Sequence, residues 1–66
     1  MQNRIKALRE QHSLTQQALA QKLSVTRQTI ISLESGRYNP SISLAHAIAK
    51  SFSLAIEEVF IFEEVQ

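Results

Sequence analysis

The sequence predicts an all-α domain of short helices joined by short connections, and three observations support this fold class. Glycine and proline each occur once in 66 residues, which is too few for the many tight turns of an all-β fold. Apolar residues recur at helical spacing in several segments. Serine or threonine residues that can cap a helix precede most of these segments. A chain of this length has room for one small core, so residues 1–66 are expected to form a single domain.

The first two helices follow from amphipathic patterns. Residues 4–12 place Ile5 and Leu8 on one side of a helix and charged side chains elsewhere, which predicts an amphipathic helix. After a short break, Thr15 can cap a second helix by accepting a hydrogen bond from a main-chain N–H. The apolar stripe expected to be buried on this second helix consists of Ala18, Leu19 and Leu23.

The third and fourth helices each begin after a capping residue. Thr26 can cap a helix that runs from Arg27 to about Ser35 and stops at Gly36, the single glycine of the chain. Ser41 can cap the fourth helix, after a loop that contains the single proline. The apolar residues of the fourth helix recur at the spacing of a strongly buried face, and they are Leu44, Ala45, Ile48, Ala49 and Phe52.

The last part of the chain permits two interpretations. Residues 54–60 combine apolar and acidic groups and predict one or two further helical turns. Residues 61–65 are rich in β-branched and aromatic side chains, which suit a strand. Such a strand would pair with residues 1–3 in a small terminal two-stranded β-ribbon, which is stable only when it is packed against the rest of the domain.

The charges are distributed unevenly along the chain. Residues 1–50 hold all seven basic residues and two of the six acidic ones, a net charge of +5, and residues 51–66 hold the other four acidic residues, a net charge of −4. A basic body with an acidic tail is typical of a surface that faces a polyanion, and a solvated charge pattern without a partner is the alternative.

The sequence has no segment typical of a targeting signal. No apolar run approaches the roughly 18 residues of a membrane span, and the first residues lack the apolar run of a signal peptide. Cysteine does not occur, which fits a reducing compartment. We therefore expect a cytoplasmic protein with no membrane among its partners.

Residue types that most enzymes need are missing. All six acidic residues are glutamates and there is no cysteine, so many catalytic sets are excluded. His12 and His46 stand 34 positions apart with no ligand cluster nearby, which favours surface histidines over a metal site. A single glycine cannot form a glycine-rich phosphate loop, and so small a core leaves little room for a ligand cavity. The sequence predicts a protein that is not an enzyme and needs no cofactor or metal.

The most informative stretch spans residues 15–36, where a short helix, a turn of about three residues and a second short helix follow one another. Its apolar anchors have helix-turn-helix spacing, and they are Leu19, Leu23, Val25, Ile30 and Leu33. The stretch, TQQALAQKLSVTRQTIISLESG, resembles the helix-turn-helix proteins of the phage-repressor and Cro type. The resemblance continues through residues 39–44 and 57–60, so it covers nearly the whole chain.

This resemblance implies a five-helix, lambda-repressor-like DNA-binding domain. The short chain is similar to small bacterial repressors that dimerise and whose terminal segments form a minor β-ribbon. One departure is Ala55, which stands where such proteins often have a capping serine, threonine or aspartate before the last helix. That helix is therefore expected to start differently or to fray.

The outward side of the third helix has the residue types that read base edges. At 100° per residue, Gln28, Ile31 and Ser32 fall on the same face as Arg27, and Thr29, Ile30 and Leu33 fall on the opposite, core-facing side. A guanidinium group suits guanine, an amide suits adenine, and a hydroxyl suits either. The expected base contacts are Thr26, Arg27, Gln28, Ile31 and Ser32.

Four of these residues have a second interpretation. Gln28 and Ser32 would also fit an ordinary solvated helix face. Arg27, at the first position of the helix, would also fit a phosphate. Ile31 would contact a thymine methyl group, or it would be one of the single exposed apolar residues that need no explanation.

Phosphate contacts are expected on both sides of this helix. Gln16 lies at the start of the second helix, where free main-chain N–H groups and the helix dipole favour an anion, and the resembling proteins also have a glutamine there. Arg37 supplies a positive charge in the loop that follows the third helix, and for Tyr38 loop packing is the alternative. The complete expected set is Thr15, Gln16, Ser35, Arg37, Tyr38 and Asn39.

Two further roles complete the prediction. Arg9 and Glu34 resemble a structural ion pair that joins the first and third helices and orients the reading helix. The C-terminal segment 54–66 holds more apolar side chains than a small core readily absorbs, so a dimer interface is expected there, with closure of the monomer core by Phe60 and Phe62 as the alternative. The interface residues are Ile56, Val59, Phe60, Ile61, Phe62 and Val65.

The sequence thus predicts a homodimer that binds a pseudo-palindromic site in double-stranded DNA and regulates transcription, as a repressor that occludes a promoter. An antitoxin-type module that binds a toxin and regulates its own promoter is the alternative, and the acidic and apolar tail would suit that role. A domain that kept the fold and lost DNA binding is disfavoured by the polar reading face.

Overall fold

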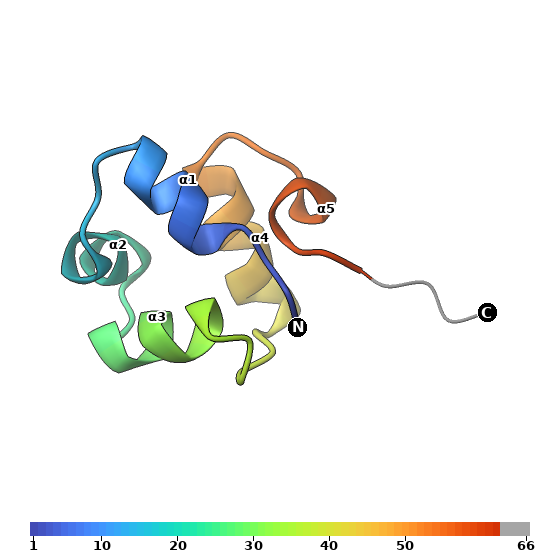
Figure 1. Cartoon of the computed structure of the whole chain (residues 1–66), viewed down its shortest axis with the longest axis horizontal. Coiled ribbons are helices and arrows are strands. Elements are labelled where there is room, and N and C mark those ends of the chain that lie inside the picture. The colour runs from blue at the N-terminus through green and yellow to red at the C-terminus, as the bar shows by residue number, and fades with distance from the viewer. Residues whose placement is uncertain (63–66) are drawn as a thin grey trace.

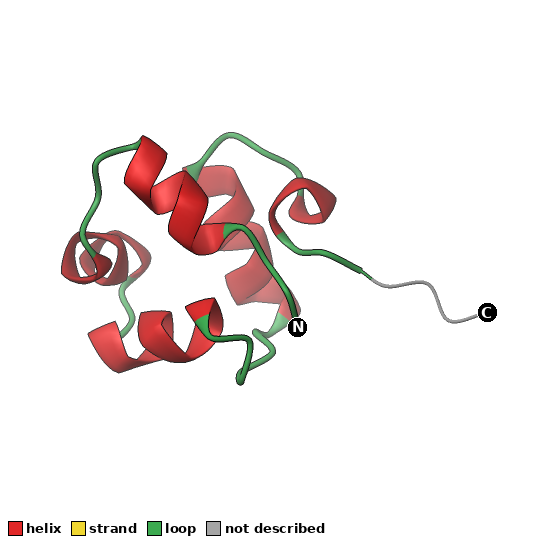
Figure 2. Cartoon of the chain, viewed as in Figure 1, coloured by secondary structure: helices red, strands yellow, loops and turns green. Residues whose placement is uncertain are grey.

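In a computed structural model of the chain, which describes residues 1–62, five helices surround one core (Figure 1). Helix α1 covers Ile5–Gln11, α2 covers Gln16–Leu23, α3 covers Arg27–Glu34, α4 covers Ile42–Ser51 and α5 covers Ile56–Val59. Loops and turns connect them, and no strand is formed within residues 1–62 (Figure 2). The predicted all-α fold with five helices is confirmed.

Three of the helices begin at the capping residues that the sequence indicates. The side-chain oxygens of Thr15, Thr26 and Ser41 accept hydrogen bonds from the main-chain N–H three residues further on, at 3.0, 3.2 and 3.1 Å. Each of these bonds satisfies an N–H group that the first turn of a helix leaves free. Ala55 has no such side chain, and Glu58 stabilises the start of α5 instead, because its carboxylate accepts a hydrogen bond of 2.9 Å from the main-chain N–H of Ala55.

Four helices end with a residue in the left-handed backbone region. Gly36 has a φ of 80°, and Ser13, Ser24 and Ser53 have φ values of 57°, 58° and 57°. After each, the next N–H reaches back over five residues, as in the 3.2 Å bond from Arg37 N to the carbonyl of Ser32. This pattern closes the last turn of a helix, so the predicted stop of the third helix at Gly36 is confirmed.

The core is assembled from residues of every helix. The buried apolar side chains are Ile5, Leu19, Ala20, Ile30, Leu33, Ala45, Ile48, Ala49, Phe52, Val59 and Phe60. The expected inner face of α4 is buried as predicted, except that Leu44 is only half-buried. Among residues 1–62, no buried side-chain nitrogen or oxygen lacks a hydrogen-bond partner, which is the condition for a stable interior.

The two ends of the described chain meet beside the core. Asn3 and Phe60 form a single antiparallel bridge, and on either side of it Arg4 N donates to Val59 O at 2.8 Å and Ile61 N donates to Gln2 O at 2.9 Å. The predicted pairing of the tail with residues 1–3 therefore occurs as one bridge, and it does not extend to a two-stranded ribbon within residues 1–62. The last part of the proposed strand lies outside the described residues.

The same region bears on the expected dimer interface. Val59 and Phe60 are 0% and 2% exposed and belong to the core cluster. These two side chains therefore close the monomer core, which is the alternative that the sequence left open. Val65, another expected interface residue, lies outside the described residues.

Across residues 1–62, no helix combines the length and the apolar composition that crossing a bilayer would require.

Candidate nucleic-acid interface

Helices α2 and α3 form a compact helix-turn-helix unit. Ser24 turns the chain after α2 with its left-handed backbone, and Val25 N donates to Ala20 O at 2.9 Å to fix that turn. Leu19, Ile30 and other buried side chains of the two helices then anchor them to the same core. Figure 1 shows α3 along one edge of the molecule, with no other helix on its outer side.

The outer side of α3 presents most of the expected reading residues. Thr26, Arg27 and Gln28 are exposed, whereas Ile31 and Ser32 are half-buried. Ile30 and Leu33, on the opposite side, are fully buried. The expected division into an outer and an inner face is therefore present, although Ile31 offers less free surface than a residue in the centre of an exposed face would.

A hollow of about 180 Å³ lies on this side of α3. Its walls are Thr26, Gln28, Thr29, Ser32 and Tyr38. Four of the five belong to α3 or its cap, and Tyr38 comes from the loop that follows, with 44% of its surface exposed. Hydroxyl and amide groups therefore converge in this hollow. These groups both donate and accept hydrogen bonds.

Thr29 was assigned to the core side from its helical angle, and the structure places it at the wall of this hollow. Its side chain is half-buried, and its hydroxyl pairs with the Thr26 hydroxyl at 2.9 Å. A signal for this exists in the sequence, because residues three apart lie above one another on a helix, and both residues of this pair are polar.

An ion pair joins α1 to the end of α3. Arg9 Nε donates to Glu34 Oε2 at 2.7 Å, Arg9 Nη2 donates to Glu34 Oε1 at 3.3 Å, and the two side chains are 10% and 8% exposed. Arg9 Nη1 also donates to the carbonyl of Leu14 at 2.9 Å. The hydrogen bond to Glu34 raises the pKa of Arg9 and outweighs the opposing effect of burial, so this guanidinium stays charged.

The ion pair continues into the expected DNA-facing residues. Gln16 Nε2 donates to Glu34 Oε1 at 3.1 Å, and Arg27 Nη2 lies 3.4 Å from Gln16 Oε1. One hydrogen-bonded chain therefore runs from Arg9 through Glu34 and Gln16 to Arg27. The structure brings together four residues that the sequence assigned to three different roles.

The expected phosphate contacts form two groups. Thr15 and Gln16 lie at the start of α2, close to the first turn of α3. Arg37, Tyr38 and Asn39 are exposed in the loop after α3. Ser35 is exposed as well, but its hydroxyl donates to the carbonyl of Ser32 at 2.9 Å, so this hydroxyl is already used within the helix. The first group therefore lies at the start of α2, and the second follows the end of α3.

Asn3 was not identified from the sequence, although it supports α3 directly. Its Nδ2 donates to Leu33 O at 2.8 Å and its Oδ1 accepts from Ile5 N at 3.0 Å. One side chain thus closes the end of α3 and the start of α1. The second bond was foreseeable, since asparagine often caps the N–H two residues later, whereas the first depends on how the helices pack.

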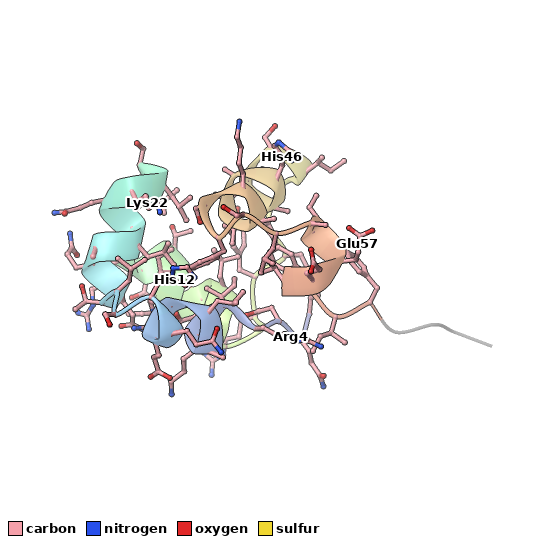
Figure 3. The ribbon with its side chains drawn as sticks, turned by 90° about the horizontal axis from the view of Figure 1, so that it is seen from above. Arg4, His12, Lys22, His46 and Glu57 are labelled. Atoms are coloured by element: carbon pink, nitrogen blue, oxygen red, sulfur yellow. The ribbon has the colours of Figure 1, made fainter. Side chains whose placement is uncertain are left out.

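The surface charges agree with this placement. Figure 3 shows Lys22 of α2 and Glu57 of α5 towards opposite ends of the molecule. Glu57 and Glu58 are exposed on α5, away from the helix-turn-helix unit, where they do not repel a polyanion.

The two histidines lie apart from this surface. The His12 ring packs against Phe52 with centroids 5.1 Å apart, and His46 is exposed on α4.

A second surface, which is apolar, lies at the start of α4. Ile61 and Phe62 are 38% and 57% exposed, Ile56 is half-buried, and Ile42, which sequence reasoning did not identify, is 85% exposed. Three of these residues, Ile42, Ile56 and Phe62, border an open groove of about 310 Å³, whose full lining is Met1, Pro40, Ile42, Ala45, Ile56, Phe60 and Phe62. We call this the apolar groove.

Comparison with known proteins gives the family. A helix-turn-helix family model matches residues 5–59. An uncharacterized HTH-type transcriptional regulator of the archaeon Methanocaldococcus jannaschii, MJ0272, is 53% identical over 97% of both chains. The immunity repressor protein of Bacillus phage phi105 is 39% identical over 92% of this chain and 46% of the phage protein.

The activator BcrR of Enterococcus faecalis, an HTH-type transcriptional regulator, is 37% identical over 94% of this chain and 30% of its own length. Because one of these relatives, MJ0272, is archaeal, the expected likeness to bacterial repressors alone was too narrow. A match over most of the chain, on a fold with an outward third helix, establishes the family. The chain belongs to the helix-turn-helix transcriptional regulators of the phage-repressor and Cro type, a DNA-binding family.

Proposed function

We propose that this protein regulates transcription by placing α3 in the major groove of a specific DNA site. The observation that carries the proposal is the outer face of α3, where the exposed Arg27 and Gln28 adjoin a hollow lined by hydroxyl and amide groups. The major groove admits an α-helix and presents a distinct donor and acceptor pattern for each base pair. A helix that is fixed at both ends by caps and packed on its inner face suits such a reading role.

Within this proposal, the residues divide between bases and backbone. Gln28 and Ser32, with Thr26 beside them, face base edges from the hollow, and Ile31 offers its remaining apolar surface to a thymine methyl group. Thr15 and Gln16 meet phosphates at the start of α2. The loop residues Arg37, Tyr38 and Asn39 meet phosphates after the end of α3, with Arg37 as the charged contact, and Ser35 joins them if its hydroxyl turns away from Ser32 O. Backbone contacts fix the register and base contacts carry the sequence information.

The hydrogen bond between Arg27 and Gln16 bears on the role of Arg27. In the free protein, its guanidinium is turned towards the start of α2, on the side where phosphates are expected. A guanidinium there reaches either a phosphate or the guanine at the edge of the site, and both suit its planar fork.

The test is selection of bound fragments from a random-sequence DNA pool, followed by Gln28→Ala. We expect the selected site to contain a symmetric motif. Loss of one bidentate base contact costs about 1–3 kcal/mol, so Gln28→Ala should weaken binding roughly five- to 150-fold for each half-site that is read and leave binding to random duplex nearly unchanged. Gln11→Ala, at an exposed glutamine of α1, is the matched control and should change neither. A protein that binds no duplex, or a Gln28→Ala variant with unaltered sequence preference, contradicts the proposal.

We further propose that the protein acts as a homodimeric repressor in the cytoplasm. Its likeness to a phage immunity repressor supports repression, and its likeness to an activator defines the competing outcome. A reporter gene placed behind the selected site should be less active when the protein is produced. Higher reporter activity would assign an activator, and a second protein that co-purifies in equal amount would favour the antitoxin alternative.

A further inference from the structure

Glu34 ends α3, and its carboxylate faces the start of α2. Its Oε2 accepts the 2.7 Å bond from Arg9, and its Oε1 accepts both the second Arg9 bond and the 3.1 Å bond from Gln16. Only 8% of this side chain is exposed. Both carboxylate oxygens are therefore engaged, and Glu34 holds a residue of α2 as well as one of α1.

This contact fixes the direction of the Gln16 amide. A glutamine amide has a donor end and an acceptor end, and only the donor end is attracted to a carboxylate. The carbonyl oxygen of Gln16 consequently points the other way, towards Arg27 Nη2 at 3.4 Å. The amide nitrogen has two hydrogens, so one remains for a further acceptor after the bond to Glu34 is made.

The positive charge of Arg9 makes the contact between Glu34 and Gln16 compatible with DNA binding. If the Glu34 carboxylate were unpaired, it would repel a phosphate that approached the side-chain amide of Gln16. Arg9 neutralises the carboxylate through two hydrogen bonds. The pair has no net charge, so Glu34 can anchor the amide without opposing an anion.

We propose that Glu34 is a positioning residue for DNA binding, which holds the Gln16 amide, and through it the Arg27 guanidinium, in the orientation that contacts DNA. The inference rests on the proposed function, in which the start of α2 and the outer face of α3 both meet the duplex. Long side chains that are ordered before binding lose less conformational entropy when they bind. Glu34 thus contributes to affinity without contacting DNA.

The test is a double-mutant cycle of DNA affinity. Gln16→Ala is made in the natural protein and in the double variant Arg9→Met with Glu34→Met, in which the amide has lost its anchor. The probe is a fluorescein-labelled duplex of about 24 base pairs, enough for two half-sites, taken from the selected pool. We expect Gln16→Ala to weaken binding roughly tenfold in the natural protein and roughly threefold or less in the double variant, since ordering one such side chain is worth a few-fold in affinity.

Gln17→Ala is the matched control, because Gln17 is the exposed neighbour of Gln16 on the same helix. It should have the same effect in both backgrounds. Equal losses from Gln16→Ala in both backgrounds, with the natural protein binding tightly, would overturn the positioning role and leave the proposed function intact. A natural protein that binds no duplex would overturn the proposed function itself.

A second measurement needs no variant and no DNA. In the free natural protein, the side-chain amide nitrogen of Gln16 should show a higher heteronuclear NOE than that of Gln17, because it is held by Glu34. Equal NOE values for the two amides would show that Glu34 does not order Gln16, and would overturn the positioning role even if the double variant were too unstable for the cycle.

Discussion

For the ion pair of Arg9 and Glu34, removing one residue is expected to destabilise the fold more than replacing both. Both side chains are almost fully buried, at 10% and 8% exposure. Removing one partner leaves an uncompensated charge in the interior, whereas replacing both by apolar groups of similar size is often nearly neutral. Because its pKa is raised, Arg9 contributes this stability in full at any pH below the ordinary pKa of arginine, and the contribution is lost only at still higher pH.

We therefore expect Glu34→Met to lower the free energy of unfolding by about 3–5 kcal/mol, because Arg9 is left buried and unpaired. The double variant Arg9→Met with Glu34→Met should lose clearly less than this. Urea unfolding at neutral pH, followed by circular dichroism, measures both. A double variant that is less stable than Glu34→Met alone would show that the charges themselves, and not their pairing, stabilise the fold.

At the scale of residues, the sequence predicted what depends on neighbours in the chain. The caps Thr15, Thr26 and Ser41 each serve an N–H three residues away, and this is a local pattern. The bond from Asn3 to Leu33 and the bond from Gln16 to Glu34 span 30 and 18 residues. Such contacts depend on how the helices pack, so no local sequence pattern predicts them.

At the scale of elements, the ends of the helices explain why one glycine suffices for so many turns. Ser13, Ser24 and Ser53 adopt the left-handed backbone that glycine usually supplies, and L residues are strained there by about 1–2 kcal/mol. Gly36 is different, because a Cβ at this position would also lie 3.2 Å from the main-chain oxygen of Met1. The close approach of Met1, together with the positive φ, therefore favours glycine at this one helix end.

Replacing Ser53 by glycine should stabilise the protein. Glycine removes the left-handed strain but loses roughly 0.5–1 kcal/mol more backbone entropy on folding, so a net gain of up to about 1 kcal/mol is expected, or a rise in Tm of roughly 4–8 °C for a domain of this size. Thermal unfolding measures it. Ala47→Gly, at an exposed position inside α4, is the opposite case and should cost about 1 kcal/mol. If both variants lost stability equally, the strain at Ser53 would be refuted.

At the scale of the whole molecule, apolar pattern alone could not divide the last residues between core and surface. Val59 and Phe60 complete the core, whereas Ile61 and Phe62, which follow immediately, remain 38% and 57% exposed. All four look alike in composition. Their division is set by the bridge between Asn3 and Phe60, which fixes which side chains turn inward, and this bridge forms only once both ends of the chain have met.

The length of α3 explains why a single copy of the protein reads too little DNA. Helix α3 has eight residues, a length of about 12 Å, and base pairs are stacked about 3.4 Å apart. One copy therefore covers only three or four base pairs. A second copy related by two-fold symmetry places another reading helix about 34 Å away, one turn along the duplex, and doubles the site. The apolar groove, beside Ile42 and Phe62, is the surface that we propose for this association.

Ile42→Ser tests this association without disturbing the monomer, since Ile42 is 85% exposed. Burying such a side chain contributes about 1.5–3 kcal/mol, and a two-fold interface buries it twice. The dimer dissociation constant should therefore rise at least about 100-fold, as measured by sedimentation velocity over a wide range of protein concentration. Ala47→Ser, also exposed on α4 but outside the groove lining, is the control and should leave the constant unchanged. A natural protein that stays monomeric at every concentration and selects a single half-site would rule out the proposed dimer, because the symmetric motif expected in its DNA site has no other source.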